Sequence, residues 1–165
     1  MKIIHASIPA DEPRRTAEVL ADIMSGEAMP FPPGGPESWM AWSADGKMEL
    51  EIVRRGDLLA YNEDQGNWRE TEHRQRLSEC HLAIGVSRPA KEIIKIAAAA
   101  GWPARLCSRG NGYFELVEVW VDGCFMLELF DPEQAAHYER VVTPENWKQF
   151  LAQIEAAQVE ARAAI

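Results

Sequence analysis

The feature that most constrains the fold is an internal repeat, because two similar halves of a chain are expected to fold into two similar units. A shift of 76 residues aligns His5 with His81 and Pro13 with Pro89. A shift of 77 residues aligns an Asp-Gly pair and a Leu-Glu pair in the two halves: Asp45-Gly46 with Asp122-Gly123, and Leu50-Glu51 with Leu127-Glu128. The one-residue difference between the shifts indicates a residue gained in a loop.

Each unit is predicted to contain a strand, a helix and three further strands. In the first unit we expect a strand, a helix, a loop and two strands at Lys2–Ile8, Pro13–Met24, Met29–Pro36, Ser38–Ser43 and Lys47–Val53. In the second unit we expect a strand, a helix and three strands at Cys80–Val86, Pro89–Ala100, Ala104–Ser108, Tyr113–Val121 and Cys124–Phe130. Proline starts both helices, and Asp-Gly is typical of hairpin turns. The predicted fold class is α+β, with two βαβββ units; the proline-rich loop leaves one strand of the first unit unplaced.

The units account for residues 1–56 and 80–132 of one domain. Residues 57–79 form a polar connector, which we expect to be a linker or partly helical. Residues 133–165 form a C-terminal helical extension, in which Thr143-Pro144 is a helix start. Its apolar stripe is expected to dock on the body or on a second subunit, and consists of Trp147, Phe150, Leu151 and Ile154.

Composition narrows the class of partner and the compartment. The chain has 165 residues and a net charge of -9, which argues against nonspecific binding of nucleic acid or anionic lipid. No apolar run approaches the roughly 20 residues of a membrane span, and the N-terminus lacks the apolar stretch of a signal peptide. We therefore expect a cytoplasmic protein. Its three cysteines have neither CxxC nor CxxH spacing, which favours reduced thiols.

Strand alternation places four polar side chains at equivalent positions. Successive side chains point to opposite faces of a strand. His5 and His81 therefore lie opposite the apolar face of each first strand, and Glu51 and Glu128 lie opposite that of each last strand. The His-to-Glu separation is 46 residues in the first unit (51 − 5) and 47 in the second (128 − 81). Since the helices are expected to cover the apolar faces, these four residues should share the other, concave face.

Two histidines and two glutamates form a ligand set suited to a divalent metal such as Zn, Ni, Co or Mn. A single strand histidine is more commonly structural, and a single outward glutamate is commonly only solvated. Recurrence of the whole set in both units favours the metal site at His5, Glu51, His81 and Glu128. Glu49 has Met126 at the equivalent position, so we expect Glu49 to be an ordinary surface residue.

The paired units, with His on the first strand and Glu on the last strand of each, resemble the vicinal oxygen chelate superfamily. This group includes glyoxalase I, methylmalonyl-CoA epimerase, fosfomycin resistance proteins, extradiol dioxygenases and bleomycin-binding proteins. The similarity covers residues 2–132, and the segment VDGCFMLELFDP resembles the Asp-Gly turn that often precedes the last metal-binding strand. The His, Glu, His, Glu pattern is similar to that of bacterial glyoxalase I. The resemblance implies a half-barrel sheet around the metal, and a homodimer with the site where two units meet.

Ligand number favours one kind of chemistry. Four protein ligands leave an octahedral ion two open positions, enough to chelate a carbonyl and a neighbouring hydroxyl. An extradiol dioxygenase needs three open positions and uses two His and one carboxylate. We therefore expect an isomerase or lyase that acts through a metal-stabilised enediolate of a small α-hydroxy or α-keto carbonyl compound. The resemblance implies that Glu128, or alternatively Glu51, is the base.

Two alternatives stay open: a noncatalytic binding protein of the antibiotic-sequestering type, and an extradiol-type dioxygenase. Glyoxalase I carries an Arg and an Asn for glutathione where this chain reads Ser7-Ile8-Pro9 and Val53-Arg54-Arg55, which argues against that substrate. Arg54, Arg55 and Arg109 are candidates for binding an anionic tail, although such residues are more commonly solvated surface charges. The 29–36 loop, with Trp39, Trp42 and Trp120, is a candidate lining for a pocket that takes an apolar or aromatic substrate, although such tryptophans are more commonly core residues. Nothing marks Cys124 as an activated nucleophile.

Overall fold

A computed structural model describes residues 5–60, 67–70, 78, 80–110 and 112–163 of the chain. The first unit comprises β1 (His5–Ala10), α1 (Pro13–Ile23), β2 (Ala28–Pro30), β3 (Trp39–Trp42) and β4 (Glu49–Arg54), with a short 3-10 helix at Pro32–Gly34. The second unit comprises β7 (Leu82–Gly85), α2 (Ala90–Ala99), β8 (Ala104–Arg109), β9 (Phe114–Val121) and β10 (Phe125–Phe130). The α+β class and the two βαβββ units are confirmed.

The two sheets have the same strand order. The first sheet runs β1-β4-β3-β2 and the second runs β7-β10-β9-β8. In each sheet the first and last strands of the unit pair in parallel, and the remaining neighbours are antiparallel. The unplaced strand of the first unit is β2, which occupies the start of the segment predicted as a loop. Residues 2–4 of the predicted first strand lie outside the described residues.

The start and end of α1 follow from local chemistry. Pro13 stands in the first turn, where its missing N–H costs nothing. Beyond the helix, Ser25 adopts a φ of 55° and the Gly26 N–H donates to the Ala21 carbonyl at 2.8 Å. A Cβ added at Gly26 would lie 1.9 Å from the Trp42 carbonyl oxygen. Glycine is therefore required here by the close approach of β3 rather than by a positive φ.

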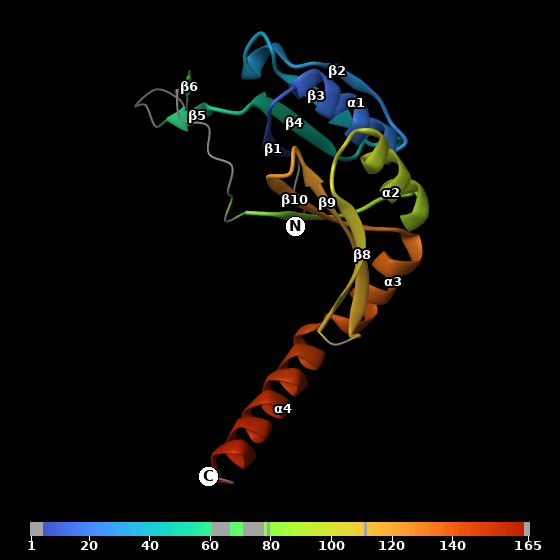
Figure 1. The fold of residues 1–165 in the computed structure, drawn as a ribbon, viewed down its shortest axis with the longest axis vertical. Helices are drawn as coiled ribbons and strands as arrows, with labels where there is room; N and C mark the ends of the chain where they lie inside the picture. Colours follow the sequence, from blue (N-terminus) through green and yellow to red (C-terminus); the bar gives the residue numbers. More distant parts are fainter. Residues whose placement is uncertain (1–4, 61–66, 71–77, 79, 111, 164–165) are drawn as a thin grey trace.

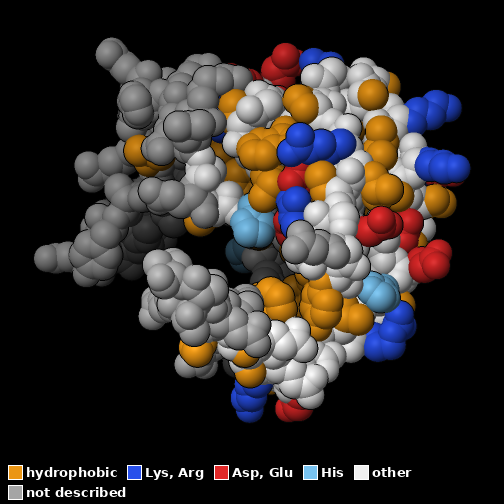
Figure 2. All heavy atoms as spheres, turned by 60° about the horizontal axis from the view of Figure 1, so that its bottom comes forward, with side chains coloured by type: hydrophobic (Ala, Val, Ile, Leu, Met, Phe, Trp, Pro, Cys, Tyr) orange, Lys and Arg blue, Asp and Glu red, His pale blue; other side chains and the backbone are white. Residues whose placement is uncertain are grey.

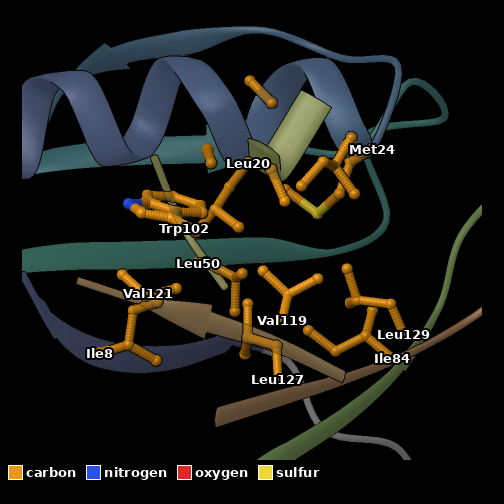
Figure 3. Close-up of a cluster of buried hydrophobic side chains, with 14 of the residues drawn as sticks. Ile8, Leu20, Met24, Leu50, Ile84, Trp102, Val119, Val121, Leu127 and Leu129 are labelled. Atoms are coloured by element: carbon orange, nitrogen blue, oxygen red, sulfur yellow. The ribbon is translucent and has the colours of Figure 1, made fainter. Parts of the chain in front are cut away.

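One apolar core serves both units. Ile8 and Leu50 of the first unit lie beside Val121 and Leu127 of the second, and each is at most 1% exposed (Figure 3). The helices α1 and α2 also contact each other. Burial of a side chain of this size contributes about 1.5–3 kcal/mol. Because alternate residues of β1, β4 and β10 enter this core, the intervening residues, including His5, Glu51 and Glu128, occupy the opposite faces of the sheets.

A buried arginine also joins the units. Arg55 is only 4% exposed, and its Nε donates to Asp11 Oδ1 at 2.8 Å. Its Nη2 lies 3.3 Å from both the Pro9 carbonyl oxygen and Asp122 Oδ2, which belongs to the second unit. Asp122 also accepts from the Asp11 backbone N–H at 2.7 Å. Charge and hydrogen bonding thus fix the relative placement of the two units in addition to apolar packing.

The structure adds detail to the connector and to the C-terminal region. Within residues 57–79, β5 (Asp57–Ala60) and β6 (Asn67–Glu70) form an antiparallel pair apart from the two main sheets (Figure 1), so the described part of the connector is not helical. The helix α3 (Pro132–Val141) follows β10 and lies within the predicted helical extension, of which only the start at Thr143-Pro144 was specified. Asp131 caps it through the backbone N–H groups of Glu133 and Gln134 and also accepts from the Ala90 N–H at the start of α2.

The predicted C-terminal helix is α4 (Pro144–Ala163), which leads away from the rest of the molecule (Figure 1). Phe150 stacks on Tyr113, with ring centroids 6.3 Å apart. Trp147 and Leu151 remain 46% and 50% exposed, and the side chain of Ile154 lies outside the described residues. Among the described helices, none is both long enough and apolar enough to span a bilayer.

Candidate metal centre

The first predicted His–Glu pair lies on β1 and β4. Their parallel register pairs His5 with Glu49 and Ser7 with Glu51. The imidazole of His5 lies between two carboxylates: its Nδ1 is 3.6 Å from Glu49 Oε1, and its Nε2 is 3.8 Å from Glu51 Oε1. The other oxygen of Glu51 accepts a hydrogen bond from the Ser7 hydroxyl. We call His5, Ser7, Glu49 and Glu51 the first half-site.

The second predicted pair lies at the start of β7 and within β10. His81 directly precedes β7, and its Nε2 is 3.7 Å from Glu128 Oε2 on β10. The other oxygen of Glu128 accepts a 3.0 Å hydrogen bond from Arg109 on β8. Arg109 also donates to Glu118, the residue opposite Glu128 on β9. We call His81, Arg109, Glu118 and Glu128 the second half-site.

The two half-sites share one geometry. In each, a histidine Nε2 faces one carboxylate oxygen while a fixed donor binds the other oxygen. The histidine side chains are equally exposed, at 49% and 50%, and the ligand carboxylates are equally buried, at 13% and 14% exposed. The repeat detected in the sequence is thus also a repeat of side-chain environment. Figure 2 shows histidine side chains (pale blue) and basic side chains (Lys or Arg, blue) beside a hollow on the face of the molecule drawn there.

Electrostatics distinguish the second half-site. Burial raises the pKa of Glu118, but hydrogen bonds from Arg109 and Arg105 outweigh this effect and lower it to about 2. The same contact with Glu118 raises the pKa of Arg109 above its ordinary value. Arg105 Nη2 lies 2.6 Å from Glu118 Oε2. Two arginines therefore balance the charges of Glu118 and Glu128 in this part of the protein.

The structure brings the four predicted ligands together as two pairs. Within the described ranges, no three side chains of the His, Cys, Asp or Glu type are grouped so that they would hold a metal ion. Two ligands about 2.1 Å from one ion are about 3.0 to 3.5 Å apart for octahedral to tetrahedral angles. The histidine nitrogen and the carboxylate oxygen of each pair can therefore occupy two adjacent coordination positions of a divalent ion if the distance between them shortens by less than about 1 Å. Their imidazole and carboxylate donors also suit such an ion.

The other candidate residues have different surroundings. Arg55 is neither a solvated charge nor open to a ligand, because it is buried between Asp11 and Asp122. Arg54 forms ion pairs with Glu37 and Asp57. The thiol of Cys124 is buried and donates to the Asp122 carbonyl at 3.1 Å.

The three tryptophans divide between two faces. Trp42 lies opposite Glu49 on the ligand-bearing face of the first sheet, and Trp120 lies opposite Met126 on that of the second. Trp39 instead packs against the core, with the Arg14 guanidinium 5.1 Å from its ring centroid. Two of the three are therefore placed on the faces that carry the candidate ligands.

Sequence reasoning missed the residues that support the candidate ligands. Ser7 was noted only as a departure from a glutathione site, and Glu49 was expected to be an ordinary surface residue. Glu49 is instead largely buried, with 16% of its side chain exposed. Glu118 had a visible signal, because a charged residue inside the apolar strand 116–121 requires a partner.

Comparison with known proteins supports the fold. No protein-family model and no curated protein matches the chain. Among solved structures, the fosfomycin resistance protein FosX from Listeria monocytogenes has a TM-score of 0.55 at 14% identity, covering 84% of this chain and 97% of that one. A mutant of the same protein, in complex with Mn(II) and 1S,2S-dihydroxypropylphosphonic acid, has a TM-score of 0.53 at 15% identity, with coverage of 84% and 96%. FosX from Mesorhizobium loti has a TM-score of 0.50 at 12% identity, with coverage of 79% and 91%.

These likenesses extend over nearly the whole length of the solved proteins, and they confirm the predicted resemblance at the level of the fold. The protein has the vicinal oxygen chelate fold. Identities of 12–15% show the architecture alone.

Proposed function

We propose that the protein is a divalent-metal-dependent isomerase or lyase of the glyoxalase type, acting on a small α-hydroxy or α-keto carbonyl compound. The observation that carries this proposal is the matched pair of half-sites, in which His5 faces Glu51 and His81 faces Glu128 at nearly the same distance. The complexed FosX structure, which contains Mn(II) and a phosphonate, supports a divalent metal and a small-molecule ligand here. Zn, Ni, Co and Mn all suit the donor set.

A bound divalent ion would polarise the substrate carbonyl. The chain's own contribution is a carboxylate that removes a proton from the neighbouring carbon, with Glu128 as the first candidate and Glu51 as the second. Glu128 accepts a hydrogen bond from the charged Arg109, and Glu51 accepts one from the neutral Ser7 hydroxyl. Comparing Glu128→Gln with Glu51→Gln at saturating metal will show which change removes turnover and which only weakens binding.

We further propose that the four ligands meet across a homodimer, the first half-site of one subunit facing the second half-site of its partner. Three observations support this arrangement. The described part of one chain pairs its ligands only two by two. Both histidines are half exposed, as expected of residues that await further contacts. On α4, the large apolar side chains of Trp147 and Leu151 are also exposed.

Mixed dimers test this arrangement. The His5→Ala and His81→Ala proteins should each bind less than about a tenth of an equivalent of metal, because each lacks a ligand in every site. In a dimer of one His5→Ala subunit and one His81→Ala subunit, one of the two sites contains both substitutions and the other contains neither. One equivalent of metal per dimer should therefore bind. Metal content of dimers purified through two different tags measures this. Mixed dimers that stay empty, or a monomeric native protein, would contradict a shared site.

Turnover is tested by isotope exchange, which reports proton removal even without net isomerisation. Metal-loaded protein in D2O should exchange the proton beside the carbonyl of a substrate, and glutamine in place of the base, Glu128 as the first candidate, should lower that rate by at least about 100-fold at saturating metal. The antibiotic-binding alternative predicts a change in tryptophan fluorescence without exchange, reported by Trp42 and Trp120. The extradiol alternative predicts oxygen consumption with a catechol.

A further inference from the structure

We propose that Glu49 is a positioning residue, which holds the His5 imidazole so that its Nε2 is directed to the metal position beside Glu51. This inference rests on the proposed metal site and deepens it. It assigns a role to a residue that sequence reasoning treated as an ordinary surface glutamate.

The placement of Glu49 is set by the backbone. Parallel pairing of β1 and β4 puts Glu49 directly beside His5 and Glu51 two residues further along the same face. The two ring nitrogens of His5 consequently face different carboxylates, at 3.6 Å for Nδ1 to Glu49 Oε1 and 3.8 Å for Nε2 to Glu51 Oε1. A histidine in this position has a carboxylate available for each ring nitrogen.

The burial of Glu49 indicates that its carboxylate lowers the stability of the fold unless it has a partner. Its Oε2 is buried and has no hydrogen-bond partner among the described residues, and the same is true of the indole Nε1 of Trp42, its cross-strand neighbour. A buried charged oxygen without a partner costs stability. A role in orienting His5 gives a reason for retaining a carboxylate at this position.

The chemistry of metal-bound histidine supplies that reason. An imidazole that binds a metal through Nε2 carries its proton on Nδ1, and this N–H usually donates to a carboxylate or carbonyl. Glu49 is the carboxylate on the Nδ1 side of His5. Its present separation of 3.6 Å is slightly longer than a hydrogen bond, so the contact must shorten by about 0.5 Å when the site closes.

The second unit provides an internal comparison. Met126 stands where Glu49 stands in the first unit, and it has no group that accepts a hydrogen bond from His81 with comparable strength. Met126 is therefore the natural control position, and methionine is the natural replacement at position 49.

The experiment uses 15N-histidine NMR on the metal-free protein, at a pH where the spectrum shows the neutral imidazole. We expect native His5 to be protonated mainly on Nδ1. Glu49→Met should move it toward the Nε2–H tautomer, whereas Glu49→Gln, whose amide oxygen still accepts, should retain the native form. The His81 signal should not change in either variant, and Met126→Ala should leave His5 unchanged.

Metal affinity is the second readout. Loss of an outer carboxylate typically weakens binding 10- to 100-fold. Titration with Co(II), followed by absorption, should show such a loss for Glu49→Met and less than about a 5-fold loss for Glu49→Gln. The inference is overturned if the native protein binds Co(II) and the Glu49→Met variant shows the same His5 tautomer and the same Co(II) affinity. A complete loss of the site in both Glu49 variants, which would make Glu49 a ligand, also overturns it. Failure of native protein to bind any divalent metal overturns the proposed function instead.

Discussion

The two half-sites have the same donor geometry but different electrostatic surroundings. In the first half-site, His5 lies between Glu49 and Glu51, and the donor that holds Glu51 is the neutral hydroxyl of Ser7. In the second half-site, Arg109 holds Glu128 and is itself bound by Glu118. The ligand positions thus agree between the units, while the residues that support them do not.

This difference shows that the first half-site presents negative charge to a metal ion, whereas in the second half-site arginine side chains already balance the carboxylates. The carboxylates of the first half-site have no arginine or lysine among their recorded partners in the described residues. The carboxylates of the second half-site are neutralised by Arg105 and Arg109. Metal binding should therefore relieve repulsion in the first half-site and compete with Arg109 in the second.

The largest expected difference concerns stability without metal. Glu118→Gln should lower the free energy of unfolding by about 3 kcal/mol, because it leaves two arginines without their buried partner. Glu51→Gln in the first half-site should change it by less than about 1 kcal/mol, since only the hydrogen bond from Ser7 is affected. Urea denaturation of the metal-free proteins measures both values, and equal losses would remove the contrast between the half-sites.

The same comparison depends on pH in a defined direction. The folded-state pKa of Glu118, about 2, is below its ordinary value of 4.5. Its contribution is therefore fully present above about pH 5 and is lost as the pH falls toward 2. The stability difference between native protein and Glu118→Gln should be constant from pH 5 to 7 and should shrink below pH 4. A difference that grows in acid would contradict this assignment.

An effect of intermediate size on stability is expected when Arg109, the side chain that competes with the metal for Glu128, is replaced. Arg109→Met should lower the stability of the metal-free protein by about 1–2 kcal/mol, but added Mn(II) should raise its Tm more than it raises that of the native protein. The reason is that the metal replaces the lost positive charge beside Glu128. Arg105→Met is the matched control, because Arg105 contacts Glu118 and has no recorded contact with Glu128. An equal metal-induced shift in all three proteins would show that Arg109 does not compete.

The smallest effect is expected in the first half-site. Ser7→Ala removes a neutral hydrogen bond to Glu51, so metal should bind about 2- to 5-fold more weakly. Ser7→Thr keeps the hydroxyl and should restore native affinity. Calorimetric titration measures these values, and a loss above 50-fold would show that Ser7 does more than steady the carboxylate.

Much of the fold was accessible from the sequence because its signals are local. Strand alternation put His5, Glu51 and Glu128 on the faces opposite the core, and the repeat related His5 to His81, which directly precedes β7 instead of lying within the predicted strand. The separate start of α3 within the predicted helical extension was not specified, although its signal is present: Asp131-Pro132 followed by Gln134 is a capping box. The β5–β6 pair lacks such a signal, since its strands lie in a mostly polar segment.

The supporting residues of the site depend on register, which a single sequence does not specify. That Ser7 pairs with Glu51 requires knowing how far β4 slides along β1, and a slip of one residue would exchange the faces. Arg109 reaches Glu128 across the intervening strand β9, a contact between residues separated by two strand pairings. The repeat was sufficient to predict the candidate metal ligands, whereas the residues that hold them in place could be identified only in the three-dimensional structure.

The arginine that spans the two units makes each half of the repeat depend on the other. A peptide that ended at Gly56 would keep Arg55 and Asp11 but lose Asp122, and one that began at β7 would keep only Asp122. In the first unit the equivalent aspartate, Asp45, lies on the surface and bonds Ser43 and Lys47 instead. The halves have therefore become interdependent, and split fragments should recover native structure only when mixed.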